Sequence, residues 1–216
     1  MTTLLNVTAS ARTDRSISRD LSAKFIETWL KSDPATSVIN RNIGLNPPEF
    51  ISESWIAACF TPLEERTAVQ QEILKQSDIL IQELEQADIL LIASPMYNYG
   101  MPAALKAWTD MVIRVNKTFS FDLARGDYPL APLFSGKTLI CLTSTGEFGF
   151  GSGGIREAMN HLEAHISTLS HYLGVTEKFF IRSEYQEFAD QRHTDSRLKA
   201  SEEVVTLAAR LASMTP

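Results

Sequence analysis

Three serines in a short polar stretch near the N-terminus predict a site for a terminal phosphate. Ser10, Ser16 and Ser18 lie in the stretch SARTDRSIS, which follows an apolar run and opens a helical pattern. A helix that begins there directs free backbone N–H groups and its positive dipole end toward one point, where hydroxyls can also donate. The stretch matches neither GxGxxG nor GxxxxGK(S/T). It has serine hydroxyls instead of the glycines that let a backbone approach a buried pyrophosphate or triphosphate closely. The alternative is that Ser16 or Ser18 only caps the helix.

A second stretch, SPMYNYGMPAALKAW, combines aromatic, amide and glycine residues directly before a helix that Pro102 opens. Backbone amides and the Asn98 side chain can form hydrogen bonds to the edge of a heteroaromatic ring, while Met96, Tyr97 and Tyr99 pack along it. The alternative is an aromatic cluster of the core. The four consecutive side chains from Met96 to Tyr99 cannot all face inward, however, and packing of a core does not require an asparagine. The stretch therefore favours a planar ligand.

A third stretch, STGEFGFGSGG over residues 144–154, holds five of the ten glycines of the chain. This density predicts a close approach of the backbone to something flat or charged. Gly149, Gly151 and Gly154 formally match GxGxxG, but the apolar run before them ends too early for a dinucleotide-binding turn. In the same way, Gly136 and the two residues after it resemble the end of a phosphate loop, but a strand rather than a helix follows.

The remaining reactive side chains do not predict a metal centre or a nucleophile. His161 and His165 have the i, i+4 spacing of two ligands, but no HExxH motif and no third ligand accompany them. Cys59 and Cys141 are far apart and form no CxxC pair, so we expect two buried thiols in a reducing cytosol. No GxSxG motif is present.

Charge and hydropathy exclude several classes of partner. The formal net charge is −6 and no long Lys/Arg run occurs, so neither nucleic acid nor an anionic membrane is expected as the main partner. The first residues lack the pattern of a signal peptide, and no apolar run has the length of a membrane span. We expect a cytoplasmic protein with one domain over residues 1–216.

The elements that must position these stretches alternate between strand and helix. We expect strands at residues 3–8, 37–43, 88–94, 137–144 and 175–181, and helices at residues 18–31, 62–86, 102–114, 155–173 and 195–213. Apolar strands that alternate with amphipathic helices predict a parallel sheet covered on both faces, in three layers. Residues 119–134 predict a long ordered loop that covers a site. Ligands of such sheets bind at the carboxyl ends of the strands, where all three stretches lie.

The three stretches resemble the FMN-dependent NADH:quinone oxidoreductases and azoreductases of the flavodoxin-like superfamily, over nearly the whole chain. The stretch SPMYNYGMPAALKAWTD carries most of the resemblance. It implies the flavodoxin-like α/β fold, a five-stranded parallel sheet of order 2-1-3-4-5 with helices on both faces. It also implies bound FMN, held by Ser10, Ser16, Ile17, Ser18, Met96, Tyr97, Asn98, Tyr99, Ser144, Thr145, Gly146 and Glu147. This chain departs from the family's Ser-Arg-Gly-Gly in the last loop, so the carboxylate of Glu147 either turns away from the ring or lowers its reduction potential.

The resemblance further implies ping-pong hydride transfer, in which NADH or NADPH reduces FMN and a quinone or azo compound then takes two electrons. It implies a homodimer with the sites at the interface, where Phe121 and Tyr172 are candidate walls of the substrate pocket. No catalytic acid or base follows from the sequence. Two alternatives remain open, which are a flavodoxin-like carrier that passes single electrons to a protein partner and a redox-sensing protein without turnover.

Overall fold

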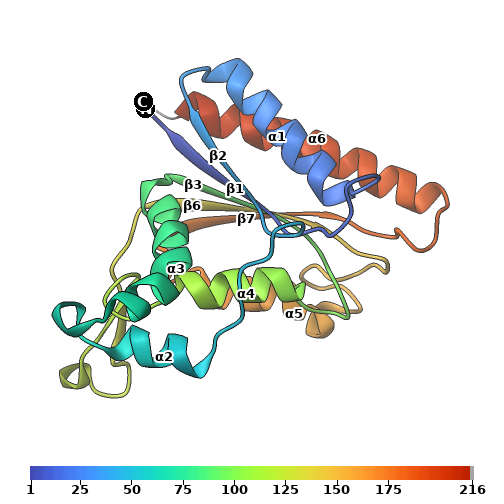
Figure 1. Cartoon of the computed structure of the whole chain (residues 1–216). Coiled ribbons are helices and arrows are strands. Elements are labelled where there is room, and N and C mark those ends of the chain that lie inside the picture. The colour runs from blue at the N-terminus through green and yellow to red at the C-terminus, as the bar shows by residue number, and fades with distance from the viewer. Residues whose placement is uncertain (215–216) are drawn as a thin grey trace.

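The computed structural model describes residues 1–214 and is built on a five-stranded parallel sheet. The strands are β1 (Thr3–Thr8), β2 (Ser37–Asn42), β3 (Ile89–Pro95), β6 (Lys137–Ser144) and β7 (Val175–Ser183). They lie in the order β2-β1-β3-β6-β7 (Figure 1), and each neighbouring pair is parallel. Counted along the chain, this is the expected order 2-1-3-4-5. The predicted strand positions are confirmed to within two residues.

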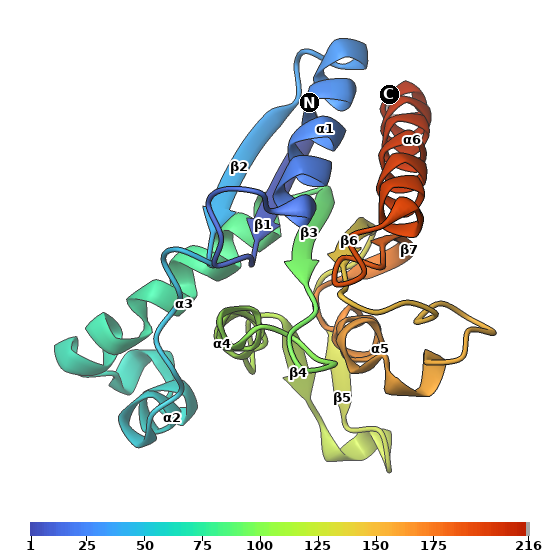
Figure 2. The ribbon, with the colours of Figure 1, turned by 90° about the vertical axis from the view of Figure 1, so that its right-hand side faces the viewer.

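Helices cover both faces of the sheet, as Figures 1 and 2 show. Helices α1 (Ile17–Ser32) and α6 (Gln191–Met214) lie on one face, and α3 (Ala68–Gln86), α4 (Ala103–Val112) and α5 (His161–Leu169) lie on the other. Each face has its own apolar core, because successive strand side chains point to opposite sides. Leu5 and Val7 belong to the core on the α3 side, whereas Leu4 belongs to the core on the α1 side. The expected three layers are therefore present.

Two of the predicted helices are much shorter than expected, α4 is slightly shorter, and one helix was not predicted. The pattern at residues 62–86 divides into a short 3-10 helix at Leu63–Glu65 and helix α3, which begins after a capping box between Thr67 and Gln70. At residues 155–173 only α5 is a regular helix, because Asn160 caps it by accepting from the N–H of Glu163. Helix α2 (Glu53–Phe60), whose N-cap is Ser52, lies beside α3 and was missed.

The predicted loop at residues 119–134 is ordered and contains a small antiparallel hairpin. Strands β4 (Phe119–Phe121) and β5 (Leu130–Pro132) pair with each other and flank a 3-10 helix at Leu123–Arg125. In Figure 2 the hairpin projects below α4 and α5. The chain runs from the hairpin into the start of β6, so the hairpin joins the sheet at the amino ends of its strands.

The carboxyl ends of the central strands bring the predicted loops together. The N–H of Ala9 donates to the carbonyl of Ala93 (2.9 Å), which joins the ends of β1 and β3. The N–H of Met96 donates to the carbonyl of Ser144 (2.9 Å), which joins the loops after β3 and β6. Within residues 1–214, no helix combines the length and the hydropathy that crossing a membrane requires.

Candidate functional site

A hollow of about 340 Å³ lies at the carboxyl ends of the strands, and all three predicted stretches line it. Its lining consists of Ser10, Arg12, Arg15, Ser16, Ile17, Pro95, Met96, Tyr97, Ser144, Gly146, Gln186 and Glu187. Seven of the residues expected at the site are in this set. The other five, Ser18, Asn98, Tyr99, Thr145 and Glu147, lie within two residues of a lining residue in the chain but do not line the hollow themselves.

At the start of α1, hydrogen-bond donors that could bind an anion have no acceptor within residues 1–214. Ser16 is the N-cap of α1, yet its side chain makes no capping hydrogen bond, so the capping alternative is wrong for Ser16. The hydroxyl of Ser18 is buried and has no hydrogen-bond partner within residues 1–214. The first N–H groups of a helix also lack acceptors within the helix. Free hydroxyls and free N–H groups at a positive dipole end are the donors that a phosphate needs.

Arg19 holds the serine stretch in place, and sequence reasoning missed it. Its guanidinium donates to the carbonyls of Ser10 (2.5 Å) and Arg12 (2.9 Å), which are loop atoms. It also donates to Thr8 Oγ1 (3.1 Å) and Asn42 Oδ1 (2.7 Å), at the ends of β1 and β2. Partial burial lowers the pKa of Arg19 from its ordinary value. A cation in the first turn of a helix opposes the dipole, and this unfavourable placement was the available signal.

Gly44 permits the closest backbone approach at the site and was also missed. A Cβ atom on Gly44 would lie 2.0 Å from the carbonyl oxygen of Ser10. The N–H of Gly44 donates to the carbonyl of Thr8 (3.0 Å), so the residue is fixed against the end of β1. The only signal in the sequence was a glycine that follows the second strand, at the carboxyl edge of the sheet.

The second stretch forms a tight turn with an unusual backbone. The N–H of Tyr97 donates to the carbonyl of Gly100 (3.1 Å), and the N–H of Gly100 donates back to Tyr97 (3.0 Å). Asn98 (φ 47°) and Tyr99 (φ 65°) are the central residues and both adopt the left-handed region, which is rare for a bulky side chain. Tyr97 is 40% exposed and Tyr99 is 38% exposed, so their rings do not belong to the core. Such strained, exposed turns are concentrated at functional sites.

The carboxylate of Glu147 faces cationic and phenolic partners rather than the hollow. Tyr99 donates its phenolic proton to Glu147 Oε2 (2.9 Å), and Arg156 forms an ion pair with Glu147 Oε1 (2.8 Å). The hydrogen bond to the carboxylate raises the pKa of Tyr99. Of the two alternatives for Glu147, the geometry supports a side chain that turns away.

The glycines of the third stretch serve the winding of the loop itself. A Cβ atom on Gly154 would lie 2.3 Å from the carbonyl oxygen of Gly149, and the N–H of Arg156 donates to that same oxygen (2.8 Å). The close approach that the sequence predicted is therefore made by the loop to its own backbone. Among the glycines of this stretch, only Gly146 lines the hollow.

A fourth segment, after β7, completes the hollow and was not predicted. The N–H of Gln186 donates to the carbonyl of Thr145 (3.1 Å), and the N–H of Glu187 donates to the carbonyl of Gly146 (3.1 Å). The side chain of Glu187 also lies close to Gly146, where a Cβ atom would approach it to 2.6 Å. The position directly after the fifth parallel strand was the signal in the sequence.

Phe121 and Tyr172 do not line the hollow of their own chain. Phe121 lies on the hairpin and is 54% exposed, and the Tyr172 ring packs against Phe119 with a centroid distance of 5.8 Å. Both therefore lie away from the hollow, near the amino ends of the strands. In the described part of the chain, His161 and His165 join no group of three or more side chains that could hold a metal ion.

Comparisons with known proteins agree with this arrangement. A family model described as a flavodoxin-like fold matches residues 2–206. The FMN-dependent NADH:quinone oxidoreductase 2 of Colwellia psychrerythraea is 55% identical over 218 residues, which cover 98% of this chain and 100% of that protein. The protein of the same name from Idiomarina loihiensis is 51% identical over 222 residues, covering 100% and 92%.

Among solved structures, an FMN-dependent NADH-azoreductase from Bacillus anthracis in complex with FMN has a TM-score of 0.85. It is 18% identical in sequence and covers 98% of this chain and 100% of its own, so it supports the fold alone. The family model and the two close relatives are decisive. The chain belongs to the family of flavodoxin-like fold that includes the FMN-dependent NADH:quinone oxidoreductases.

Proposed function

We propose that this chain is a single-domain FMN-dependent oxidoreductase that uses NADH or NADPH to reduce quinones by two electrons and to cleave aromatic azo compounds. The observation that carries the proposal is the meeting of the serine stretch, the Tyr97 turn and the Ser144 loop around one hollow. The two relatives, which are covered over 100% and 92% of their length, are named for the quinone activity, and this favours an enzyme over a single-electron carrier.

The serine stretch binds the phosphate of FMN in this proposal. Ser10, Ser16 and Ser18 supply hydroxyls, and the backbone at Ile17 supplies an N–H at the start of α1. The Ser18 hydroxyl gains the partner that it lacks in the protein alone. A dianion at this helix start is stabilised by the dipole, which is why a phosphorylated flavin is preferred to riboflavin.

The loops after β3 and β6 hold the flavin ring, and bound FMN supplies the hydride-transfer chemistry. Met96, Tyr97, Asn98 and Tyr99 lie along the ring. Within residues 1–214 the N–H groups of Asn98 and Tyr99 have no backbone acceptor, so both can donate to the ring. On the other side, Ser144, Thr145, Gly146 and Glu147 provide backbone contacts to the ring. Arg156 compensates the Glu147 carboxylate, so its charge does not oppose an electron-rich ring.

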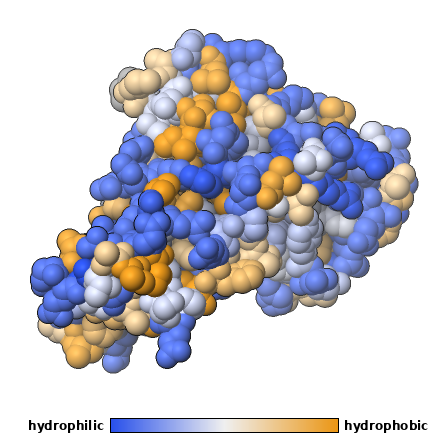
Figure 3. All heavy atoms as spheres, viewed as in Figure 1, coloured by the Kyte–Doolittle hydropathy of each residue, from blue (hydrophilic) through white to orange (hydrophobic). Residues whose placement is uncertain are grey.

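We further propose a homodimer in the cytoplasm, with each site completed by a second copy. Large apolar side chains are exposed on α2, on the segment after it and on the hairpin, at Phe60, Leu63, Phe121, Leu123 and Tyr128. Apolar residues also gather at the lower left of Figure 3. Exposed apolar side chains of this kind mark association surfaces. Phe121 and Tyr172, which are remote from the hollow in their own chain, then serve as pocket walls across the interface. Light scattering on the purified protein tests the dimer.

Absorption spectroscopy tests the proposed activity. Purified protein is loaded with FMN, and its visible spectrum is recorded before and after anaerobic NADH or NADPH, and again after a quinone. We expect bleaching by the nicotinamide and recovery with the quinone, with one quinone consumed per nicotinamide oxidised. Bleaching and recovery only with a one-electron protein acceptor would indicate a carrier. Binding without reduction would indicate a sensor, and absence of FMN binding would refute the proposal.

A further inference from the structure

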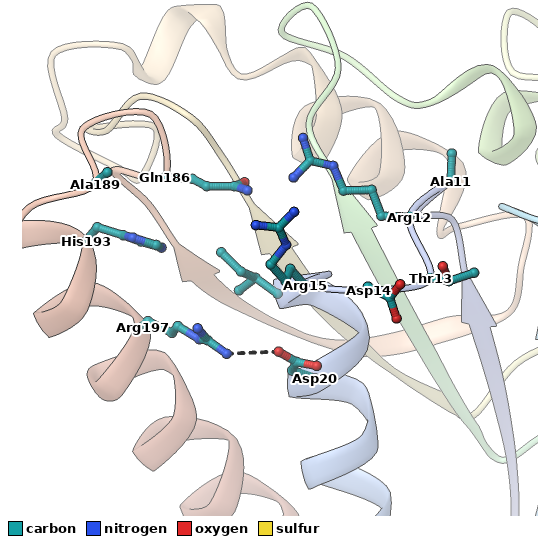
Figure 4. A pocket seen from close by; sticks show the side chains of 11 residues that line it. Ala11, Arg12, Thr13, Asp14, Arg15, Asp20, Gln186, Ala189, His193 and Arg197 are labelled. Carbon is teal, nitrogen blue, oxygen red and sulfur yellow. Dashed lines mark hydrogen bonds and ion pairs between the residues drawn. The ribbon is translucent and has the colours of Figure 1, made fainter.

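The segment after β7 holds one wall of the hollow in a fixed position. Three successive N–H groups, from Tyr185 to Glu187, donate to three carbonyls of the loop after β6, each at 3.1 Å. The Tyr185 ring also stacks on the Phe148 ring, with a centroid distance of 4.4 Å and an interplanar angle of 10°. Gln186 lines the hollow, and in Figure 4 its side chain points toward Arg15 of the serine stretch. An ordered backbone therefore carries the next side chain, that of Glu187.

Gly146 provides the space in which the Glu187 carboxylate lies. A Cβ atom on Gly146 would lie 2.6 Å from both Cδ and Oε1 of Glu187. Gly146 does not have a positive φ, so no left-handed backbone requires a glycine at this position. The glycine instead lets the carboxylate lie against the loop that holds the flavin ring in the proposed function. Both residues line the hollow.

The Glu187 carboxylate has no hydrogen bond or ion pair within residues 1–214, unlike its neighbours at this edge of the sheet. Glu147 forms an ion pair with Arg156 at 2.8 Å, and Glu184 Oε1 accepts from the N–H of Phe150 at 3.0 Å. FMN carries hydrogen-bond donors of its own, which are the imide N–H of the ring and the ribityl hydroxyls. An ionised carboxylate is a strong acceptor for such groups.

The charge of Glu187 acts at the ring end of the hollow. Among the lining residues within residues 1–214, Glu187 is the one carboxylate, and the cations Arg12 and Arg15 lie in the serine stretch, where the FMN phosphate offsets them in the proposed function. The hydrogen bond to Glu147 is the main cause that raises the pKa of Tyr99, and the charge of Glu187 adds a smaller contribution. The carboxylate therefore acts on the turn that lies along the ring.

We propose that Glu187 is a further flavin-binding residue, which accepts a hydrogen bond from FMN and lowers the reduction potential of the bound ring. The inference rests on the proposed function, because it takes the loop after β6 as a support of the ring. Reduction adds negative charge to the ring, and a carboxylate beside it makes that addition less favourable. A lower potential makes reduced FMN a stronger electron donor toward quinones and azo compounds. Glu187 thus adjusts the driving force of the second half of the reaction.

Two substitutions separate the hydrogen bond from the charge. Glu187→Gln keeps an acceptor oxygen and removes the charge, whereas Glu187→Ala removes both. Fluorescence titration of flavin-free protein measures the Kd for oxidised FMN, and equilibration with a reference dye measures the midpoint potential of bound FMN.

For Glu187→Gln we expect the equilibrium constant for two-electron reduction to rise about tenfold, which corresponds to a potential about 30 mV higher. The Kd for oxidised FMN should change less than about twofold, because the acceptor remains. For Glu187→Ala we expect a similar rise in potential together with a Kd about fivefold higher. Glu177→Gln is the matched control, because Glu177 is an exposed carboxylate near the other end of β7 and outside the hollow. It should change neither quantity, and circular dichroism verifies that each variant folds.

The remaining outcomes also decide the question. A Glu187→Gln variant with the same potential as the Glu177→Gln control overturns the inference and leaves the proposed function intact. A Glu187→Ala variant that binds oxidised FMN as tightly as Glu187→Gln also overturns it, because the carboxylate then does not contact the flavin. Variants that change only the KM for NADH or for the quinone assign Glu187 to substrate binding instead and overturn the inference. If the unmodified chain does not bind FMN, the proposed function fails and the inference fails with it.

Discussion

Replacing Arg19 with methionine tests whether the serine stretch is pre-organised for a phosphate. The guanidinium donates four hydrogen bonds, and two of them hold the loop carbonyls of Ser10 and Arg12. Methionine keeps most of the aliphatic stem and the helix propensity but donates nothing. The variant therefore releases the loop from the ends of the two strands without removing any group that contacts the proposed phosphate.

The expected magnitude follows from the four lost bonds. Each contributes about 1 kcal/mol net, and because Arg19 is only partly buried, water replaces roughly half of that total. We expect the free energy of unfolding to fall by about 2 kcal/mol. If the loss of the two loop bonds leaves the binding-competent loop populated in about one molecule in ten, the apparent Kd for FMN rises about tenfold.

Fluorescence titration of flavin-free protein with FMN, together with urea unfolding, measures both quantities. Lys24→Met is the matched control, because Lys24 is an exposed cation of the same helix whose amino group donates a hydrogen bond to Ser201, away from the hollow. We expect the control to leave the FMN Kd within about twofold of the wild type. An Arg19→Met variant whose FMN affinity equals that of the control would refute the positioning role of Arg19, whatever its stability.

Three further outcomes follow from the site. Gly44→Ala places a Cβ atom 2.0 Å from the Ser10 carbonyl oxygen, so we expect urea unfolding to show a loss of about 2 kcal/mol or more, and wild-type stability would contradict the close approach. Ser18→Ala removes a buried hydroxyl without a partner, so the FMN Kd should rise about fivefold with flavin-free stability within about 0.5 kcal/mol, and the reverse pattern would contradict a phosphate role. Glu147→Gln removes the carboxylate that raises the pKa of Tyr99, so the phenol should ionise at lower pH. Tyrosinate absorbance, with Tyr99→Phe to identify the signal, measures this shift, and an unchanged titration would contradict the contact.

The sheet was predictable because its signals are local. Near-continuous apolar runs at β1, β3 and β6 are long enough to mark strands buried on both faces, and the helices between them fix the parallel arrangement. The predicted helix boundaries were wrong where a side-chain capping contact sets the start of the helix. The Asn160 side chain accepts a hydrogen bond from the N–H of Glu163 and so sets the start of α5. The apolar periodicity continues across residues 155–173 and does not reveal that contact.

The site was predictable only as far as it follows from the sheet. Residues at or just after the carboxyl ends of β1, β3 and β6 had to meet, because parallel strands end at one edge. Ser10, Tyr97 and Ser144 do line one hollow. Glycine density was the weaker guide. The crowded Gly149 and Gly154 accommodate each other, whereas the isolated Gly44 makes the approach that fixes the serine stretch.

That difference has a physical origin, which also accounts for Arg19. Both Gly44 and Arg19 act through atoms that are distant in sequence or in another loop, such as the Ser10 carbonyl, so no pattern within their own segment records the contact. For Arg19 the sequence does show an unfavourable local placement, because a cation in the first turn of a helix opposes the helix dipole. A residue that is unfavourable where it stands must be offset elsewhere in the fold. Such residues are therefore the ones to examine first when a loop is proposed to bind an anion.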